Sequence, residues 1–200
     1  MYPLKVYLFS GKRKCGKDYV TDRLFESLDK EYAVIIKISA PIKEHWAKVK
    51  GLDYEQLLSS SSYKEKYRKE MLPWSEKMRN DDYGIFCRAA VDMFNGLAEK
   101  PIWIVSDIRR KTDIRWFKEN FGAAIKTIKI IAGDDIRKSR GWVFEEGIDD
   151  QETECDLDDV EEWDLIITNH STDEVDKAIE DMKQEIQECL TRNELKHAHH

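Results

Sequence analysis

The sequence predicts an α/β fold in which a five-stranded parallel sheet lies between layers of helices. Short apolar runs rich in β-branched and aromatic residues alternate with stretches whose apolar residues recur every three or four positions. This alternation is typical of parallel strands joined by right-handed helical crossovers. The 200 residues suffice for one domain with a substantial core, and the chain contains no internal repeat.

The first apolar run, residues 4–9, leads into a loop with the spacing G-x-x-x-x-G-K, from Gly11 through Gly16 to Lys17. A strand, such a loop and a helix in this order form a P-loop, whose backbone N–H groups make an anion-binding nest at the positive end of the helix. Lys17 is expected to reach the β- and γ-phosphates of a nucleotide. The motif therefore predicts a three-layer P-loop kinase fold.

Asp18 stands where the P-loop ordinarily carries the Ser or Thr that holds Mg²⁺. Its carboxylate would bind the metal directly or through water, or orient the phosphoryl acceptor, and the sequence leaves these roles open.

Lys12, Arg13 and Lys14 add three cations inside the loop, which indicates several phosphates nearby. Cys15 is expected to be a small filler rather than a nucleophile. A chance glycine pattern with a solvated charge run is the alternative, and the preceding strand disfavours it.

The next elements are expected as a helix over residues 17–28, a strand over 33–38 and a helix over 39–48. Ser39 is the expected N-cap of the second helix, and Gly51 its C-terminal stop.

Three more helices are expected over residues 53–58, 63–80 and 85–95, and the serine run at 59–62 is expected to break the chain between the first two. The second contains Pro73, where a bend is expected, and the third has an apolar stripe at Ile85, Ala89 and Met93. Residues from about 42 to 95 thus form a helical lobe between the second and third strands, where an acceptor substrate would bind.

Several cations of this lobe are candidates for binding an anion. Lys43 lies in the first turn of its helix, where a cation opposes the dipole; a ligand phosphate and ordinary surface placement both explain it. Lys64 and Arg68 share a helix face, with a solvated charged helix as the alternative, and Arg88 lies near the apolar stripe.

A third strand over residues 101–106 is followed directly by Asp107, Arg109 and Arg110. An Asp at the carboxyl end of such a strand can hold Mg²⁺ through water, and paired arginines clamp phosphates. The alternative is an acidic cap with ion pairs for the helix at 114–121.

After a fourth strand over residues 125–131, Asp134 is the expected cap of a short helix that carries Arg137 and Arg140 as lid residues, within a lid of about residues 134–150. Residues 145–164 contain 12 acids. They lack EF-hand spacing, so a solvated flexible segment is expected rather than a metal site.

The fifth strand is expected over residues 163–168, with Asn169 and His170 at its end. A capping box at residues 171–174 then opens a last helix with a buried stripe from Val175 to Cys189.

Charge is distributed unevenly along the chain. Residues 1–140 carry a formal charge of +9 and residues 141–200 one of −16. Because the cations are interspersed with acids and the acidic end would repel a long phosphate backbone, small phosphorylated substrates are favoured over nucleic acid.

Other features bound the class of protein. The four cysteines show neither C-x-x-C nor zinc spacing, and no apolar run reaches membrane-spanning length. We expect reduced thiols and a cytosolic protein without a membrane partner. A monomer is also expected, because P-loop kinases of this size are often monomers. Residues 197–200 are interpreted as a tag remnant.

The arginines after the third and fourth strands, and the absence of an N-K-x-D guanine-reading element, favour a phosphotransferase over a GTP switch. Transfer between two anions needs many cations to align them and neutralise developing charge, so the acceptor is expected to be a phosphate.

These residues resemble the animal-type phosphomevalonate kinases, relatives of the nucleoside monophosphate kinases. The resemblance extends over nearly the whole chain, through LFSGKRKCGKD, SAPIKE, SSYKEKYRKEM, FCR, PIWIVSDIRR, SRGWVF, GIDDQETECDLD and TNH. It implies transfer of the γ-phosphoryl of MgATP to mevalonate 5-phosphate, giving mevalonate 5-diphosphate and ADP in isoprenoid and sterol (including cholesterol) biosynthesis.

The resemblance also implies roles for residues. It assigns to ATP the loop residues Gly11, Lys12, Arg13, Lys14, Cys15, Gly16, Lys17 and Asp18, with Lys17 and Asp18 essential to transfer. Arg109 and Arg110 would hold the acceptor phosphate beside Ser106 and Asp107, and Arg137 and Arg140 would act on ATP from the lid. Asn169 and His170 would contact nucleotide or substrate, and further acceptor candidates are Lys43, Lys64, Arg68, Arg79 and Arg88.

Two rival functions remain. A nucleoside monophosphate kinase could use the same sheet and arginines, although the helical lobe shows no obvious means of reading a base. A noncatalytic P-loop module is disfavoured by the intact Lys17 and Asp18. Some relatives end in a serine-arginine-leucine peroxisomal signal that this chain lacks, which again favours the cytosol.

Overall fold

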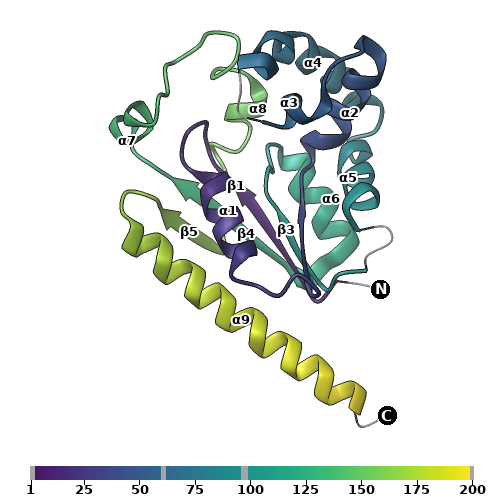
Figure 1. The fold of residues 1–200 in the computed structure, drawn as a ribbon, viewed down its shortest axis with the longest axis vertical. Helices are drawn as coiled ribbons and strands as arrows, with labels where there is room; N and C mark the ends of the chain where they lie inside the picture. The colour runs from purple at the N-terminus through teal and green to yellow at the C-terminus, as the bar shows by residue number, and fades with distance from the viewer. Residues whose placement is uncertain (1–2, 60–61, 96–98, 199–200) are drawn as a thin grey trace.

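The computed structural model describes residues 3–59, 62–95 and 99–198, and its centre is a parallel sheet (Figure 1). The five strands have the order β2-β3-β1-β4-β5, and every neighbouring pair is parallel. The strands are β1 (Lys5–Ser10), β2 (Ala33–Ile36), β3 (Ile102–Val105), β4 (Ile125–Ile131) and β5 (Leu165–Thr168). The predicted five-stranded parallel α/β fold is confirmed.

Helices cover both faces of this sheet because successive side chains of a buried strand point to opposite sides. Tyr7 and Phe9 of β1 pack with α1 (Lys17–Glu26) and the long α9 (Thr172–Ala198) on one face. Val6 and Leu8 pack on the other face with α5 (Ile85–Asn95) and α6 (Lys111–Phe121), after which a 3-10 turn, η1 (Gly122–Ala124), leads into β4.

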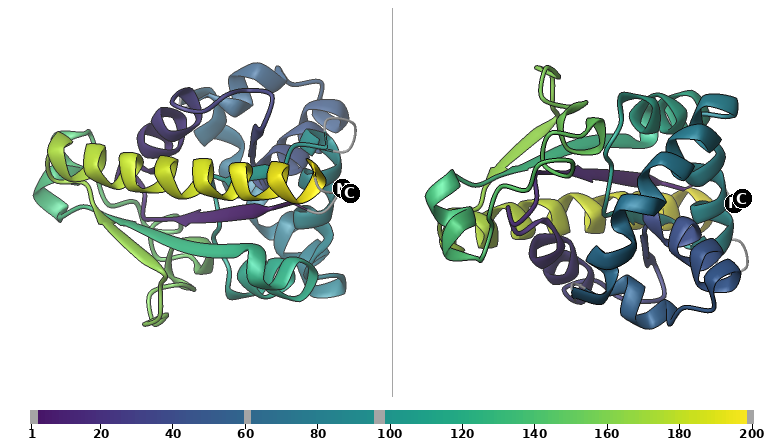
Figure 2. Two further views of the ribbon diagram at one scale, coloured as in Figure 1. Left: turned by 90° about the horizontal axis from the view of Figure 1, so that it is seen from below. Right: turned by 90° about the horizontal axis from the view of Figure 1, so that it is seen from above.

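The carboxyl ends of the strands meet the remaining helices (Figure 1). These are α2 (Ser39–Lys50), α3 (Tyr54–Leu58), α4 (Ser62–Asp81), α7 (Asp134–Ser139) and α8 (Glu152–Cys155). Viewed onto this edge, α7 lies at one end and the lobe of α2–α4 at the other (Figure 2, right). Ligands of such sheets bind at this edge, so the fold places the candidate site there.

Two predicted helix caps are wrong. Ile38, not Ser39, is the N-cap of α2, and the Asp107 carboxylate accepts from the backbone N–H groups of Ile38 (2.6 Å) and Ser39 (3.0 Å). A carboxylate that follows β3 thus supplies the cap that the local sequence was expected to supply. Gly133, not Asp134, is the N-cap of α7, while Asp134 lies in the first turn and pairs with Arg137. The predicted stop at Gly51 is confirmed by its left-handed conformation, φ 64°.

The buried face of α5 also differs from the prediction. Phe86, Cys87 and Ala90 are buried, whereas Met93 is exposed. The helix lies between α2, β2 and α6, so packing on more than one side selects a face one residue away from the predicted stripe. The predicted stripe of α9 is confirmed from Val175 to Ile186, and Leu190 rather than Cys189 continues its buried face.

The expectation of a solvated acidic segment is wrong for its central residues. The side chains of Glu154 on α8 and of Asp149 are 1% and 6% exposed, because both lie against the basic P-loop. The sequence shows the surplus of acids but not the cations that they would meet.

Two interpretations fall partly outside the described residues. They are the break expected between residues 59 and 62, of which 60 and 61 are not described, and the tag remnant, of which residues 199 and 200 are not described. Among the described residues, none of the helices combines the length and apolarity needed to cross a bilayer.

Candidate functional site

The P-loop runs from the end of β1 to the start of α1, and its two glycines are structurally required. Gly16 is the N-cap of α1 with φ 85°, and a Cβ there would lie 2.1 Å from Asn169 Nδ2. A Cβ on Gly11 would lie 2.5 Å from Cys15 Sγ and 2.7 Å from the Ile130 carbonyl oxygen. Buried Cys15 is a filler here, as predicted, and burial, its largest influence, raises the pKa of its thiol against the opposing charge of Lys17.

Lys17 is 7% exposed and donates to the Ser106 carbonyl oxygen at the end of β3 and to Asp18 Oδ1, the latter at 2.7 Å. Partial desolvation of the Asp18 carboxylate raises its pKa, but the charge and hydrogen bond of Lys17, with Lys37 and Arg109, outweigh this and hold the pKa below its usual value. The Asp18 side chain is 82% exposed, so it remains accessible to a ligand. An ionised carboxylate therefore stands beside the P-loop lysine.

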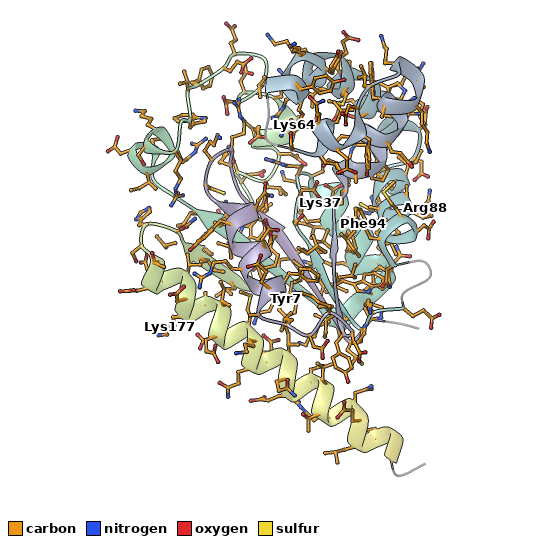
Figure 3. The ribbon with its side chains drawn as sticks, in the orientation of Figure 1. Tyr7, Lys37, Lys64, Arg88, Phe94 and Lys177 are labelled. Carbon is orange, nitrogen blue, oxygen red and sulfur yellow. The ribbon has the colours of Figure 1, made fainter. Side chains whose placement is uncertain are left out.

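A cavity of about 220 Å³ lies between the P-loop, the end of β3 and the helical lobe. Its walls include seven cationic side chains, namely Lys17, Lys37, Lys43, Lys64, Arg68, Arg79 and Arg109. Three acidic side chains, Asp18, Asp107 and Glu154, also line it. Figure 3 shows Lys37 and Lys64 at this end of the molecule. The cavity thus has a cationic surplus suited to a ligand with several negative charges.

Lys43 is a cavity cation whose pKa is lowered by its surroundings. Burial lowers its pKa to about 8, the nearby Lys64 and Lys37 add to this, and Asp107 opposes it. The pKa of Lys43 therefore lies close to neutral pH, and a bound anion would stabilise the charged form of its amine.

The cavity brings together nine of the residues that the sequence suggested. These are Lys17, Asp18, Lys43, Lys64, Arg68, Arg79, Ser106, Asp107 and Arg109. They come from α1, α2, α4 and the end of β3, so residues up to 92 positions apart in the chain share one wall.

Other predicted residues lie outside the cavity. Arg110 is 4% exposed and pairs with Glu76 and, at 2.6 Å, with Glu152. Arg88 is exposed on the outer side of α5, pairs with Asp82 and points away from the cavity (Figure 3).

The two arginines expected in the lid donate hydrogen bonds to backbone carbonyl oxygens of the P-loop. Arg137 Nε donates to the Arg13 carbonyl oxygen at 2.9 Å, and Arg140 Nη1 donates to that of Cys15 at 2.9 Å. Asn169 Nδ2 donates to the same Cys15 oxygen at 2.8 Å. These contacts restrain the carbonyl groups of Arg13 and Cys15 and so tie the P-loop to α7 and to the end of β5.

The remaining predicted residues surround this loop. His170 Nε2 accepts from the Gly133 N–H at 2.9 Å, beside the start of α7. Lys12 donates to Asp158 at 2.6 Å and Arg13 to Asp149 at 3.0 Å, while Lys14 is exposed. The loop cations are thus partly neutralised by the acidic segment.

Lys37, Glu154 and Asp113 are charged residues at or near the cavity that the sequence did not suggest. Lys37 directly follows β2, and its position at the carboxyl end of a strand was the signal that would have found it. Glu154 lies within a run of acids, and nothing in the sequence distinguishes it from the other acids of that run. Asp113 lies in the first turn of α6, where an acid commonly accepts from the N-cap backbone, but its ion pair with Arg79 has no local signal.

Asp113 joins the lobe to the loop after β3. Its side chain is fully buried, with Oδ1 accepting from Arg79 Nη1 at 2.6 Å and Oδ2 accepting from the backbone N–H groups of Arg109 and Arg110, both at 3.1 Å. Burial lowers the pKa of Arg79, but the charge and hydrogen bond of Asp113 outweigh this and raise it. One buried carboxylate therefore positions two cavity arginines, one through its side chain and the other through its backbone.

Comparison with known proteins decides the family. The family described as phosphomevalonate kinase matches residues 9–123, which is more than half of the chain and includes the P-loop, the lobe and Arg109. The chain belongs to the phosphomevalonate kinase family. It is 45% identical over 168 residues to a phosphomevalonate kinase from Drosophila melanogaster, a match that covers 83% of this chain and 88% of that one. The predicted resemblance is confirmed, and the chain is an enzyme of the kinase class.

A solved structure of lower similarity supports the fold. The crystal structure of TT1252 from Thermus thermophilus superposes with a TM-score of 0.58 at 14% sequence identity, covering 92% of this chain and 98% of that one. At this identity the likeness extends to the fold alone.

Proposed function

We propose that this member of the phosphomevalonate kinase family transfers the γ-phosphoryl group of MgATP to mevalonate 5-phosphate, giving mevalonate 5-diphosphate and ADP in isoprenoid and sterol biosynthesis. The observation that carries the proposal is the cavity in which Lys17 of the P-loop and Arg68 of the lobe line the same space. A phosphate donor and a phosphate acceptor would repel one another there unless several cations lay between them, and the cavity supplies these cations.

The P-loop residues from Gly11 to Asp18 are proposed to bind the ATP phosphates through backbone N–H groups and Lys17. Arg137, Arg140, Asn169 and His170 support this loop or lie beside it, and are proposed to act on nucleotide from that side. Arg137, Arg140 and Asn169 restrain the carbonyl groups of Arg13 and Cys15, and so are proposed to help hold the loop in the conformation that binds phosphate.

Mg²⁺ is proposed to accompany ATP. Among the residues that the structure describes, Asp18 and Asp107 are the carboxylates that line the cavity besides Glu154. Mg²⁺ is usually bound by one or two carboxylates together with substrate phosphates and water. Asp18 fits this donor set because it is ionised and accessible. Asp107 already accepts two backbone N–H groups of α2, so it fits a bond through water better than a direct bond. The metal would neutralise charge on the transferred group.

The acceptor is proposed to lie between Arg109 and the lobe. Lys43, Lys64, Arg68 and Arg79 face the cavity from α2 and α4, with Ser106 beside Lys17. Arg110 is proposed to position α4 and α8 relative to each other rather than to touch the substrate, because it forms ion pairs with Glu76 of α4 and Glu152 of α8. Arg88 is the least supported of the predicted acceptor-binding residues, because it lies on the outer side of α5 and pairs with Asp82.

The acceptor is tested by a coupled assay of ADP release with MgATP, comparing mevalonate 5-phosphate with AMP, CMP, UMP and GMP. Saturable turnover with mevalonate 5-phosphate alone is expected. Turnover with a nucleotide would keep the P-loop chemistry but replace the acceptor, and absence of turnover with all five would favour a noncatalytic module.

The Lys43 pKa predicts a pH dependence of acceptor binding. Since the free enzyme loses the Lys43 charge above about pH 8 and a bound phosphate favours the charged form, KM for mevalonate 5-phosphate should rise with pH above that value. The rise should approach about tenfold per pH unit until the pKa of the complex is reached. Steady-state kinetics between pH 7 and 9.5 measure it.

Lys43→Arg is the matched variant for this prediction, because a guanidinium keeps its charge throughout that range. Its KM should be independent of pH. A rise in KM with pH that is identical in both enzymes would assign the titration to another group.

Location and oligomeric state stay predictions. We infer a cytosolic monomer; free Cys15 and Cys87, both buried, suit a reducing compartment. Size-exclusion chromatography with light scattering would test the monomer.

A further inference from the structure

Glu154 is an acidic residue in the wall of a cationic cavity, and its contacts are unusual. Its Oε1 accepts from Arg109 Nη1 at 2.8 Å and from Arg68 Nη2 at 3.1 Å, while its Oε2 accepts from the backbone N–H of Arg13 at 3.2 Å. The side chain is 1% exposed. One carboxylate therefore contacts the P-loop, the end of β3 and the lobe at once.

The donors around this carboxylate are those that bind phosphate in other proteins. A backbone N–H of a P-loop and two guanidinium groups form a charge-assisted anion site. The carboxylate supplies one negative charge and two oxygens, whereas a phosphoryl group supplies nearly two charges and three oxygens. A substrate phosphate would use the same donors more fully.

Further contacts hold the segment that carries Glu154 onto the P-loop. Lys12 Nζ donates to the Glu154 carbonyl oxygen at 2.7 Å and to Asp158 at 2.6 Å. Asp149 accepts from Arg13 Nη1 at 3.0 Å. Lys12 and Arg13 are P-loop cations, so their contacts with the acidic segment would compete with phosphate binding, as the contacts of the Glu154 carboxylate would.

We propose that the Glu154 carboxylate occupies a phosphate-binding position between the P-loop, Arg109 and Arg68, and that a phosphoryl group of the substrates displaces it. Glu154 neutralises the facing arginines while the cavity holds no substrate. If it stayed in place when phosphates bind, it would repel them across the same donors, so its release accompanies binding. This inference rests on the proposed function, because phosphorylated substrates are what bring the competing anion.

The test measures binding of inorganic pyrophosphate by isothermal titration calorimetry. In Glu154→Gln the side chain keeps its shape but loses its charge, so pyrophosphate should bind on the order of tenfold more tightly than to the unsubstituted chain. Glu161→Gln is the matched control, because it makes the same charge change at an exposed residue of the same acidic stretch. The control should bind as the unsubstituted chain does.

Unchanged or weaker binding to Glu154→Gln would overturn the proposal, since it would make Glu154 a residue that positions the arginines for phosphate. Equal tightening in both variants would also overturn it, by assigning the effect to net charge. Because the readout is binding, tightening confined to Glu154→Gln supports the inference even if mevalonate 5-phosphate fails as an acceptor.

A measurement on the unsubstituted chain covers the case in which Glu154→Gln does not fold. A crystal structure with pyrophosphate should show a phosphoryl group on Arg13 N, Arg68 and Arg109 with Glu154 displaced. Pyrophosphate bound elsewhere with Glu154 still on these three donors would overturn the proposal.

Discussion

Asp18→Asn should lower kcat by about 10²- to 10³-fold, the range found when an electrostatic group that acts in the transition state is removed, while ATP binding remains close to normal. The Asp18 carboxylate is ionised, accessible and 2.7 Å from Lys17, and the amide keeps its shape without its charge. ATP binding is retained because the P-loop backbone and Lys17 remain. Steady-state kinetics and calorimetry with a nonhydrolysable ATP analogue measure the two quantities.

Asp22→Asn is the matched control for this prediction. Asp22 lies one turn further along α1, close enough to Asp18 and Lys37 to interact with their charges, and is not part of the cavity wall. Its kcat should remain near that of the unsubstituted enzyme. If both variants lost activity equally, or if Asp18→Asn kept full kcat, Asp18 would have no specific function in transfer.

Asp113→Ala should lower the free energy of unfolding by about 3 to 5 kcal/mol, the cost of removing one partner of a buried ion pair. The substitution leaves Arg79 charged in the interior and deprives the N–H groups of Arg109 and Arg110 of their acceptor. Urea denaturation followed by circular dichroism gives this value.

A second variant separates charge from hydrogen bonding at this position. Asp113→Asn keeps an oxygen acceptor, so it should lose less stability than Asp113→Ala, although the Arg79 charge stays uncompensated. Glu162→Ala, at an exposed residue, should leave stability almost unchanged. Equal stability of all three variants would show that the buried pair contributes nothing to folding.

The fold was predictable because its signals are local. Each strand is a short apolar run, and each crossover helix has its own periodic stripe, so neither depends on knowing a distant partner. The same locality explains the errors at Ser39 and on α5. The cap of α2 comes from Asp107, 69 residues from Ile38, and the buried face of α5 is set by the elements that surround it, α2, β2, α4 and α6.

The candidate site was predictable in part for a related reason. Parallel strands bring their carboxyl ends to one edge, so residues just after a strand, such as Asp107 and Arg109, can be assigned to the site without knowing its shape. The same rule would have found Lys37. It does not distinguish Arg109 from its neighbour Arg110, which turns away from the cavity to pair with Glu76 and Glu152.

The sequence by itself determined the parallel sheet, the P-loop with Asp18 after its lysine, and the surplus of cations near the strand ends. Only the tertiary structure decided which of these cations face the cavity and which acids neutralise them. Glu154 is one of 12 acids between residues 145 and 164 and is distinguished by where α8 lies, against Arg13, Arg68 and Arg109. The physical reason is that ion pairs form between groups adjacent in space, and burial selects among chemically equivalent side chains that the sequence does not distinguish.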